Sequence, residues 1–183
     1  IRDSHSWPAL LPWLFEHGEG GNALHRQTAV FVLYIVLETF VDSETLKEYL
    51  PRIMSLFAKG LQDPESLEVR ITTVRALGKV AENLEADGHG DLAAMQSAVP
   101  QMVAVLQQCL DASHTEGARQ IFDVFENLCM LEAPVLSVHL AELIAFFVRN
   151  AANRDHEEDL RLMCLNSLVW TCLLYTSPSP RDG

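Results

Sequence analysis

Basic residues are scarce in this sequence. Its 183 residues include 13 lysines and arginines against 25 aspartates and glutamates, which gives a formal net charge of −12. A surface this acidic repels nucleic acid and anionic membranes, and it attracts basic proteins. The charge balance therefore argues against a nucleic-acid partner and favours basic protein partners.

Long apolar stretches are also missing. The longest apolar run, Ala29–Leu37, stops at Glu38 and falls far short of the roughly 20 residues that a membrane-spanning helix needs. The first ten residues lack the basic start and the apolar core of a signal peptide. We therefore predict no membrane insertion. The sequence begins without Met, so we expect a fragment or a processed product.

Metal-binding cysteine motifs are absent. Cys109, Cys129 and Cys164 lie far apart within helical patterns, and no Cys-x-x-Cys pair occurs. This spacing fits neither a zinc site nor the disulfide framework of a secreted protein. We expect free, buried thiols and a reducing compartment.

Catalytic motifs are absent as well. The glycine-rich stretch 17–21 (HGEGG) lacks the Lys-Ser/Thr of a phosphate-binding loop, and 87–91 (DGHGD) lacks the alternating acids of a calcium loop. His114 and His139 each have a nearby Glu, but no serine or cysteine completes a nucleophilic motif. We predict no catalytic residue, no metal, no cofactor and no enzymatic activity.

What the sequence does contain is helical periodicity along nearly its whole length. Over 67–84, apolar residues recur every three or four positions and form one stripe on a helix, with Arg70, Arg75, Lys79 and Glu82 on the other side. Gly78 costs about 1 kcal/mol against Ala within a helix, so we expect a neighbouring helix to approach closely there. Comparable patterns predict helices over 8–15, 23–40, 43–61, 92–110, 113–131, 134–150 and 155–170.

The ends of these helices carry recognisable signals. Asn22, Ser43 and Asp155 are predicted N-caps, because their side chains can accept hydrogen bonds from the first backbone N–H groups. Ser113 and Pro134 are expected to open the helices that follow them. Two predicted helices contain an internal proline and should be kinked or split there, at Pro51 and Pro100.

The helices recur with a long period. Long helices restart near residues 22, 65, 113 and 155, and each interval holds two antiparallel helices. A period of roughly 40–47 residues is typical of HEAT repeats, whose stacked helix pairs share one core. We predict an all-α HEAT-repeat α-solenoid of about four repeats, with approximate units 1–20, 21–63, 64–111, 112–153 and 154–171. An irregular helical bundle is the alternative.

Two adjacent segments resemble HEAT-repeat helices. Residues 63–84 resemble the first helix of a repeat, with the pairs Val69–Arg70 and Leu77–Gly78 at the expected places. Leu46–Pro64, with its Tyr-Leu-Pro start, resembles the second helix of the preceding repeat. These motifs specify the fold more closely than the function.

A longer succession of segments is similar to a known family. Residues 6–14, 99–111, 118–153 and 159–170 resemble, in order, the N-terminal third of the importin-β (karyopherin-β) family, most of all its importin beta four branch. The resemblance covers most of Trp7–Trp170.

The resemblance implies a nuclear transport receptor that shuttles between cytoplasm and nucleus. Such a receptor carries basic cargo, here ribosomal proteins and histones, through the nuclear pore and releases it when GTP-bound Ran binds. In this family, cargo and Ran contact mainly the concave surface made by second helices, and Phe-Gly nucleoporins bind apolar grooves between first helices.

Basic cargo calls for an acidic surface. The acids that the resemblance assigns to second helices are the candidate cargo-binding residues: Glu44, Glu48, Asp91, Glu132 and Glu142. Further acids cluster within 82–91 and 155–159. A solvated polar face without a partner is the alternative reading of these charges.

The last twelve residues, Cys172–Gly183, break the helical pattern with two prolines and no apolar period. Read back into codons, they resemble the translation of a transposase sequencing adapter. We therefore expect the native reading frame to end near Thr171 and the chain to be a piece of a larger solenoid. A natural tail rich in Ser and Pro is the alternative.

Another HEAT scaffold, such as a phosphatase regulatory subunit, is the main functional alternative. A scaffold of that kind is expected to have shorter and nearly identical repeats. The repeats of this sequence are longer and irregular, which favours the transport receptor.

Overall fold

Helices make up all the regular structure in the part of the chain that can be described. The computed structural model describes residues 7–39, 42–86 and 92–176. In chain order the elements are the 3₁₀-helix η1 (Trp7–Leu10), α1 (Leu11–Gly18), α2 (Ala23–Thr39), α3 (Ser43–Gly60), α4 (Leu67–Ala86), α5 (Leu92–Asp111), α6 (Thr115–Met130), the 3₁₀-helix η2 (Ser137–His139), α7 (Leu140–Ala152) and α8 (Glu158–Thr176).

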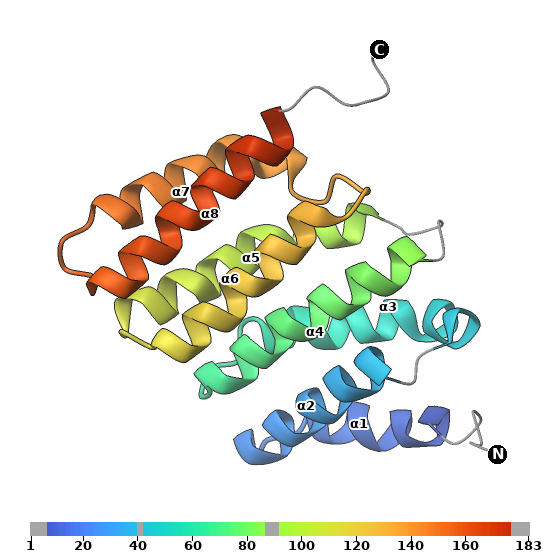
Figure 1. Ribbon diagram of the computed structural model, residues 1–183. Coiled ribbons are helices and arrows are strands. Elements are labelled where there is room, and N and C mark those ends of the chain that lie inside the picture. The colour runs from blue at the N-terminus through green and yellow to red at the C-terminus, as the bar shows by residue number, and fades with distance from the viewer. Residues whose placement is uncertain (1–6, 40–41, 87–91, 177–183) are drawn as a thin grey trace, which may run out of the picture.

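The helices form two layers. The even-numbered helices stack in one layer, with α2 on α4, α4 on α6 and α6 on α8, as Figure 1 shows. The odd-numbered helices form the other layer, where α1 packs against α2, α3 against α4, α5 against α4 and α6, and α7 against α8. Helices α1 and α8 lie at opposite ends of this stack (Figure 1). The arrangement confirms the predicted all-α HEAT-type solenoid.

The two layers differ in spacing. Neighbouring even-numbered helices pack directly against one another, whereas the odd-numbered helices contact each other only sparsely. A stack of helix pairs bends toward the layer whose helices lie closer together, so the even-numbered layer is on the inner side. This reverses the expected assignment, which placed α3, α5 and α7 on the concave surface.

Helix α4 lies in the middle of the stack and is buried on more than one side. Its buried residues include Val69, Thr73, Ala76 and Val80 in addition to the predicted apolar stripe. The prediction of a single apolar stripe was too narrow, because α4 contacts α2, α6, α3 and α5 at once.

Gly78 marks a close approach between α4 and α6. A Cβ atom at this position would lie 3.0 Å from Cγ1 of Val124. The close approach of a neighbouring helix, predicted from a glycine within an otherwise good helix, is therefore confirmed.

Four helix starts differ from prediction and one agrees. The Asn22 side chain accepts hydrogen bonds from the N–H groups of Leu24 and His25 at 2.9 and 3.2 Å, so it caps α2 as predicted. Asp42, not Ser43, caps α3 by accepting from the Thr45 N–H at 2.9 Å.

Helix α6 is capped by His114, not opened by Ser113. Nδ1 of His114 accepts from the Gly117 N–H at 2.9 Å, and Ser113 has a positive φ of 51° in the preceding turn. Helix α7 begins at Leu140 and not near Pro134, because a turn and η2 come first. Helix α8 begins at Glu158, so Asp155 belongs to the turn before it.

Neither internal proline splits its helix. Pro51 and Pro100 lie within α3 and α5, which each run without interruption. At the other end of the chain, α8 continues to Thr176, so residues 172–176 are helical, contrary to expectation. The rest of the tail, 177–183, lies outside the described residues, and its origin stays a prediction.

Arginines tie the layers together at the start of three helices. Arg26, Arg70 and Arg161 are each the fourth residue of α2, α4 and α8. Arg26 forms an ion pair with Asp63, Arg70 donates to the carbonyl of Asp63 at 2.8 Å, and Arg161 donates to the carbonyl of Ala151 at 2.9 Å. Each arginine thus joins an even-numbered helix to the turn at the end of an odd-numbered helix.

Candidate binding surfaces

A polar groove runs across the even-numbered layer. It lies between α4 and α6 and reaches α2 at one edge. Its lining residues are Tyr34, Arg75, Gly78, Lys79, Glu82, Gln120, Asp123, Val124 and Asn127. Because α4 and α6 contribute side chains of both charges, the groove can hold a charged segment of a partner.

Two basic residues of α4, Lys79 and Arg75, line the groove and differ in their partners. Lys79 is paired with Glu82 at 3.1 Å and with Glu38 at 3.8 Å. Arg75 lies over the ring of Tyr34, 4.4 Å from its centroid. The Lys79 charge is therefore neutralised by carboxylates, whereas Arg75 is held by an uncharged aromatic ring.

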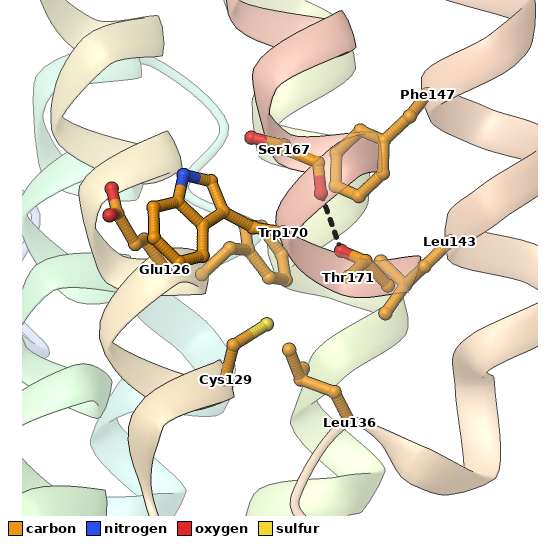
Figure 2. Close-up of a pocket in the computed structure, with 9 residues that line it drawn as sticks. Glu126, Cys129, Leu136, Leu143, Phe147, Ser167, Trp170 and Thr171 are labelled. Carbon is orange, nitrogen blue, oxygen red and sulfur yellow. Dashed lines mark hydrogen bonds between the residues drawn. The ribbon is translucent and has the colours of Figure 1, made fainter. Parts of the chain in front are cut away.

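A second hollow lies between α6, α7 and α8, and Figure 2 shows eight of its residues labelled. The rim carries Glu126 and Trp170, and the interior holds Cys129, Leu143 and Phe147. Its volume of about 10 Å³ is just enough for one water molecule. This hollow is therefore a packing defect between helices and not a ligand site.

The chemistry of this hollow is also inert. Thr171 donates from its hydroxyl to the carbonyl of Ser167 at 2.7 Å, drawn as the dashed line in Figure 2. Burial raises the pKa of the Cys129 thiol, and the nearby Glu126 raises it further, against a lowering by a hydrogen bond with Thr171. A thiol with a raised pKa stays protonated at neutral pH and is a poor nucleophile.

Two apolar grooves open on the odd-numbered layer. The first lies between α3 and α5, has a volume of about 230 Å³ and is lined by residues such as Met54, Ala58 and Ala98. The second lies between α5 and α7, has a volume of about 340 Å³ and is lined by residues such as Val103 and Phe146. They exist because the odd-numbered helices are too far apart for their side chains to interlock.

The predicted cargo-binding acids occupy the odd-numbered layer and its turns. Glu44 and Glu48 are exposed on α3, and Glu132 is exposed in the turn after α6. Glu142 is in the first turn of α7, where it forms an ion pair with His139 at 3.5 Å and borders the α5–α7 groove. Asp91 lies outside the described residues. The structure thus places these acids on two separate parts of the layer.

The other predicted acids have mixed surroundings. The Glu85 carboxylate accepts a hydrogen bond from the Ala133 N–H at 3.0 Å, which fixes the turn after α6. Asp155, Glu157, Glu158 and Asp159 are exposed around the turn between α7 and α8. The acids of this second group are exposed to solvent, whereas Asp87 and Asp91 lie outside the described residues.

The predicted HEAT-consensus residues lie inside the stack. Val69 and Leu77 are buried in the core, Gly78 meets Val124, and Arg70 bridges to the turn at Asp63. Arg70 also donates to the side chain of Gln108 at the end of α5. Their contacts are those of residues that hold repeats together.

Sequence patterns missed the groove of the even-numbered layer. Tyr34 and Arg75 are 41 residues apart, and Asp123 lies on a third helix. Arg75 was predicted only to lie on the polar side of its helix. The one signal in the sequence is the helical spacing of polar residues within 75–82 and within 120–127. This spacing gives each helix a polar face, but it does not show that the two faces meet.

Two kinds of site are not found in the described part of the chain. No group of three His, Cys, Asp or Glu residues there is close enough to hold a metal ion. Among the described helices, none combines the length and apolarity required to cross a membrane.

Comparisons with known proteins agree on one kind of relative. A family model described as "IPO5-like, TPR repeats" matches residues 1–146. The chain is 29% identical over 172 residues to "Probable importin subunit beta-4" of Schizosaccharomyces pombe, covering 93% of this chain and 16% of that protein. It is 22% identical over 166 residues to "Importin-4" of Mus musculus, covering 89% of this chain and 15% of that protein.

The fold is similar to that of a solved karyopherin. The crystal structure of the karyopherin Kap121p bound to the extreme C-terminus of the protein phosphatase Cdc14p matches with a TM-score of 0.67 and 21% identity. The match covers 96% of this chain and 16% of that one. At this identity, the likeness supports the fold.

Proposed function

The chain belongs to the importin-β (karyopherin-β) family, near its importin-4 branch, and on this premise we propose that it forms part of a nuclear transport receptor. The receptor binds basic cargo and Ran, carries the cargo through the nuclear pore and shuttles between cytoplasm and nucleus. The chain spans 16% and 15% of the two importins it matches, so the activity of a whole receptor belongs to this proposal.

The observation that carries the proposal is an acidic helical-repeat surface in a member of this family. The net charge of −12 attracts basic proteins over a long range, and the two layers offer extended surfaces on both sides of the stack. The related Kap121p is solved in complex with a segment of another protein. The proposed activity is binding, without catalysis.

Ran binding tests the receptor proposal directly. We expect the 183-residue chain, immobilised on a sensor surface, to bind Ran loaded with a non-hydrolysable GTP analogue and not Ran loaded with GDP. Equal binding to both forms, or none to either, would count against the proposal. A HEAT scaffold with another role would give one of these two results.

Cargo binding is proposed for the exposed acids of the odd-numbered layer, Glu44, Glu48, Glu132 and Glu142, together with Asp91. The double variant Glu44→Lys/Glu48→Lys is expected to weaken binding of a histone-tail peptide by about tenfold, because attraction becomes repulsion at two positions. Fluorescence anisotropy of the labelled peptide measures the change.

The matched control is Glu157→Lys/Glu158→Lys. Both of these acids are exposed at the turn between α7 and α8, and the charge change of the whole chain is the same. An equal loss of affinity in both double variants would show that only net charge matters. That result would remove Glu44 and Glu48 as specific cargo contacts.

The apolar grooves of the odd-numbered layer are the proposed sites for Phe-Gly nucleoporins. Support comes from the two grooves between α3 and α5 and between α5 and α7, whose lining is mostly apolar. The benzyl side chain of a phenylalanine can bury its apolar surface in a groove of this kind. The resemblance places such grooves between first helices, whereas we propose them between α3, α5 and α7, in the layer that the same resemblance assigns to second helices.

Blocking one groove tests this assignment. Ala145 is exposed on α7 and lines the α5–α7 groove, whereas Ala141 is exposed one turn away and does not. Ala145→Lys is expected to reduce binding of a Phe-Gly repeat peptide, measured by NMR chemical-shift titration. Ala141→Lys should leave it unchanged, and identical behaviour of the two variants would contradict the assignment.

A further inference from the structure

Arg75 is the cation of the polar groove that has no acidic partner. Among the described residues, no carboxylate forms an ion pair with its guanidinium group. Two acids of this region are engaged elsewhere: Glu38 contacts the Tyr34 hydroxyl at 3.4 Å and Lys79 at 3.8 Å, and Glu82 contacts Lys79 at 3.1 Å. A half-buried arginine without a carboxylate is thus available to a partner.

Tyr34 holds Arg75 in place. The guanidinium lies over the ring at 4.4 Å, and Nη2 donates to the Tyr34 hydroxyl at 3.3 Å. Tyr34 itself is only 9% exposed, so its ring is fixed by the core. The remaining N–H groups of Arg75 form a rigid fork, which is the geometry that binds a carboxylate through two hydrogen bonds.

The opposite wall of the groove offers the other charge. Asp123 is exposed on α6 and has no ion pair among the described residues. The amide side chains of Gln120 and Asn127 lie one turn before and after it. Gly78 and Val124 bring the two helices close together, so Arg75 and Asp123 face one groove.

The charge of the whole chain limits what can bind here. A net charge of −12 repels acidic proteins, so a carboxylate reaches Arg75 only as part of a segment that is basic overall. We propose that the groove between α4 and α6 binds a basic peptide segment that carries one acidic residue. The acid pairs with Arg75 and a neighbouring basic residue pairs with Asp123. The inference rests on the proposed binding of basic partners and adds a selectivity to it.

The paired arrangement supplies selectivity. Basic residues of a partner are attracted to every acid on the surface and can bind in many registers. A single carboxylate that must meet Arg75 fixes one register, because any other register leaves that carboxylate against acids. The groove therefore selects among basic segments.

Two synthetic peptides test the selectivity. Both consist of Gly, Ser and Lys and differ only at one central residue, which is Glu in one peptide and Gln in the other. Long-range attraction favours the Gln peptide, because it is more positive. We expect the 183-residue chain to bind the Glu peptide about tenfold more tightly. Two hydrogen bonds between the Glu carboxylate and the Arg75 guanidinium outweigh the stronger long-range attraction of the Gln peptide. Fluorescence anisotropy gives both dissociation constants.

Two variants assign the selectivity to the groove. Arg75→Gln is expected to abolish the preference for the Glu peptide, whereas Arg119→Gln, which removes the same charge from an exposed position on α6, should keep it. Asp123→Asn should weaken both peptides alike and keep the preference. Because Asp123 is exposed, this variant folds even if Arg75→Gln is destabilised.

The outcomes separate this inference from the proposed function. If neither peptide binds, the binding of basic partners fails, and this inference fails with it. If both peptides bind without preference, or if the preference survives in Arg75→Gln, the inference is wrong while binding of basic partners stands. Loss of the preference in Arg75→Gln alone supports the inference.

Discussion

At the scale of single residues, the ion pair between Arg26 and Asp63 is the most buried charge interaction in the described structure. The two side chains are 10% and 3% exposed, and Nε of Arg26 lies 2.6 Å from Oδ2 of Asp63. Asp63 also accepts hydrogen bonds from the N–H groups of Glu65 and Ser66. One carboxylate thus orders the turn between α3 and α4 and anchors α2 to it.

Asp63 makes the stability of the chain sensitive to acid. Burial alone raises the pKa of this carboxyl, but hydrogen bonds from Arg26, Glu65 and Ser66 and the attraction of Arg26 lower it below its ordinary value of 3.8. A lowered pKa in the folded state means that the stabilisation is complete above about pH 4 and is lost as the pH falls through the folded value.

We predict that Asp63→Asn lowers the free energy of unfolding by about 3 kcal/mol at pH 7, because Arg26 is left buried without its partner. The variant should also lose less stability than the wild type between pH 5 and pH 2. Urea unfolding at several pH values measures both effects. The exposed Glu157→Gln is the control, and a wild-type acid response in Asp63→Asn would contradict the assignment.

The cysteines provide a second prediction at this scale. Cys109 and Cys164 are fully buried, and burial raises the pKa of each thiol to about 11. Iodoacetamide reacts with the thiolate, so neither residue should be modified in the folded chain at pH 7.5. Mass spectrometry should find native labelling at Cys172, slower labelling at the half-buried Cys129, whose thiol pKa is also raised, and labelling at all four cysteines in guanidinium. Rapid native labelling of Cys109 would contradict the packing of α5.

At the scale of helices, glycines decide how closely neighbouring elements approach. Gly117 in the first turn of α6 lies beneath the capping ring of His114 and against Ile71 of α4. An added Cβ would come within 2.6 Å of Nδ1 of His114 and would also overlap Ile71. At Gly78 the only close atoms belong to Val124, at 3.0 Å or more. The same substitution therefore has different consequences at the two positions.

We predict that Gly117→Ala destabilises the chain by about 1–3 kcal/mol, because it displaces the helix cap and overpacks the contact with α4. Gly78→Ala should cost less than 1 kcal/mol, since the gain in helix propensity offsets a small shift of Val124. Thermal and urea unfolding of both variants measure the difference. Equal destabilisation by the two substitutions would show that the His114 cap does not control the start of α6.

At the scale of the whole molecule, charge and layer spacing control behaviour. The acidic side chains behind the net charge of −12 lie on both layers, and few of them are neutralised by a buried ion pair such as that of Asp63 with Arg26. The close packing of the even-numbered helices leaves a polar groove on the inner side, and the open spacing of the odd-numbered helices leaves apolar grooves on the outer side. The two faces are therefore suited to different partners.

We predict that added salt stabilises the chain. Raising NaCl from 20 to 300 mM should increase the thermal midpoint by about 2–4 °C, equivalent to about 1 kcal/mol, because salt screens the repulsion between acids. Circular dichroism melts measure the shift. The variant Glu157→Gln/Glu158→Gln/Asp159→Asn should show a smaller response, and a fall in the midpoint with salt would contradict this view.

The sequence alone determined the helices and their approximate limits. The recurrence of apolar residues every three or four positions specifies a helix wherever it occurs, and Asn22 and the Asp63–Pro64 break act through neighbouring backbone groups. The family resemblance and the solenoid architecture also followed from patterns along the chain. The tightly packed position of Gly78 was predictable, because a mid-helix glycine in a regular pattern needs a compensating contact.

Only the tertiary structure decided which helices share a layer and which side chains meet. Helix α4 is buried by four neighbouring helices. The pairing of Arg26 with Asp63 and the stacking of Arg75 on Tyr34 join residues that are 37 and 41 positions apart. Asp42 and not Ser43 caps α3, because Asp42 has an extended backbone (φ −98°, ψ 150°) and Ser43 is already the first helical residue. Local patterns encode period and capping, whereas the grooves depend on helix spacing, which is set by side-chain packing between layers.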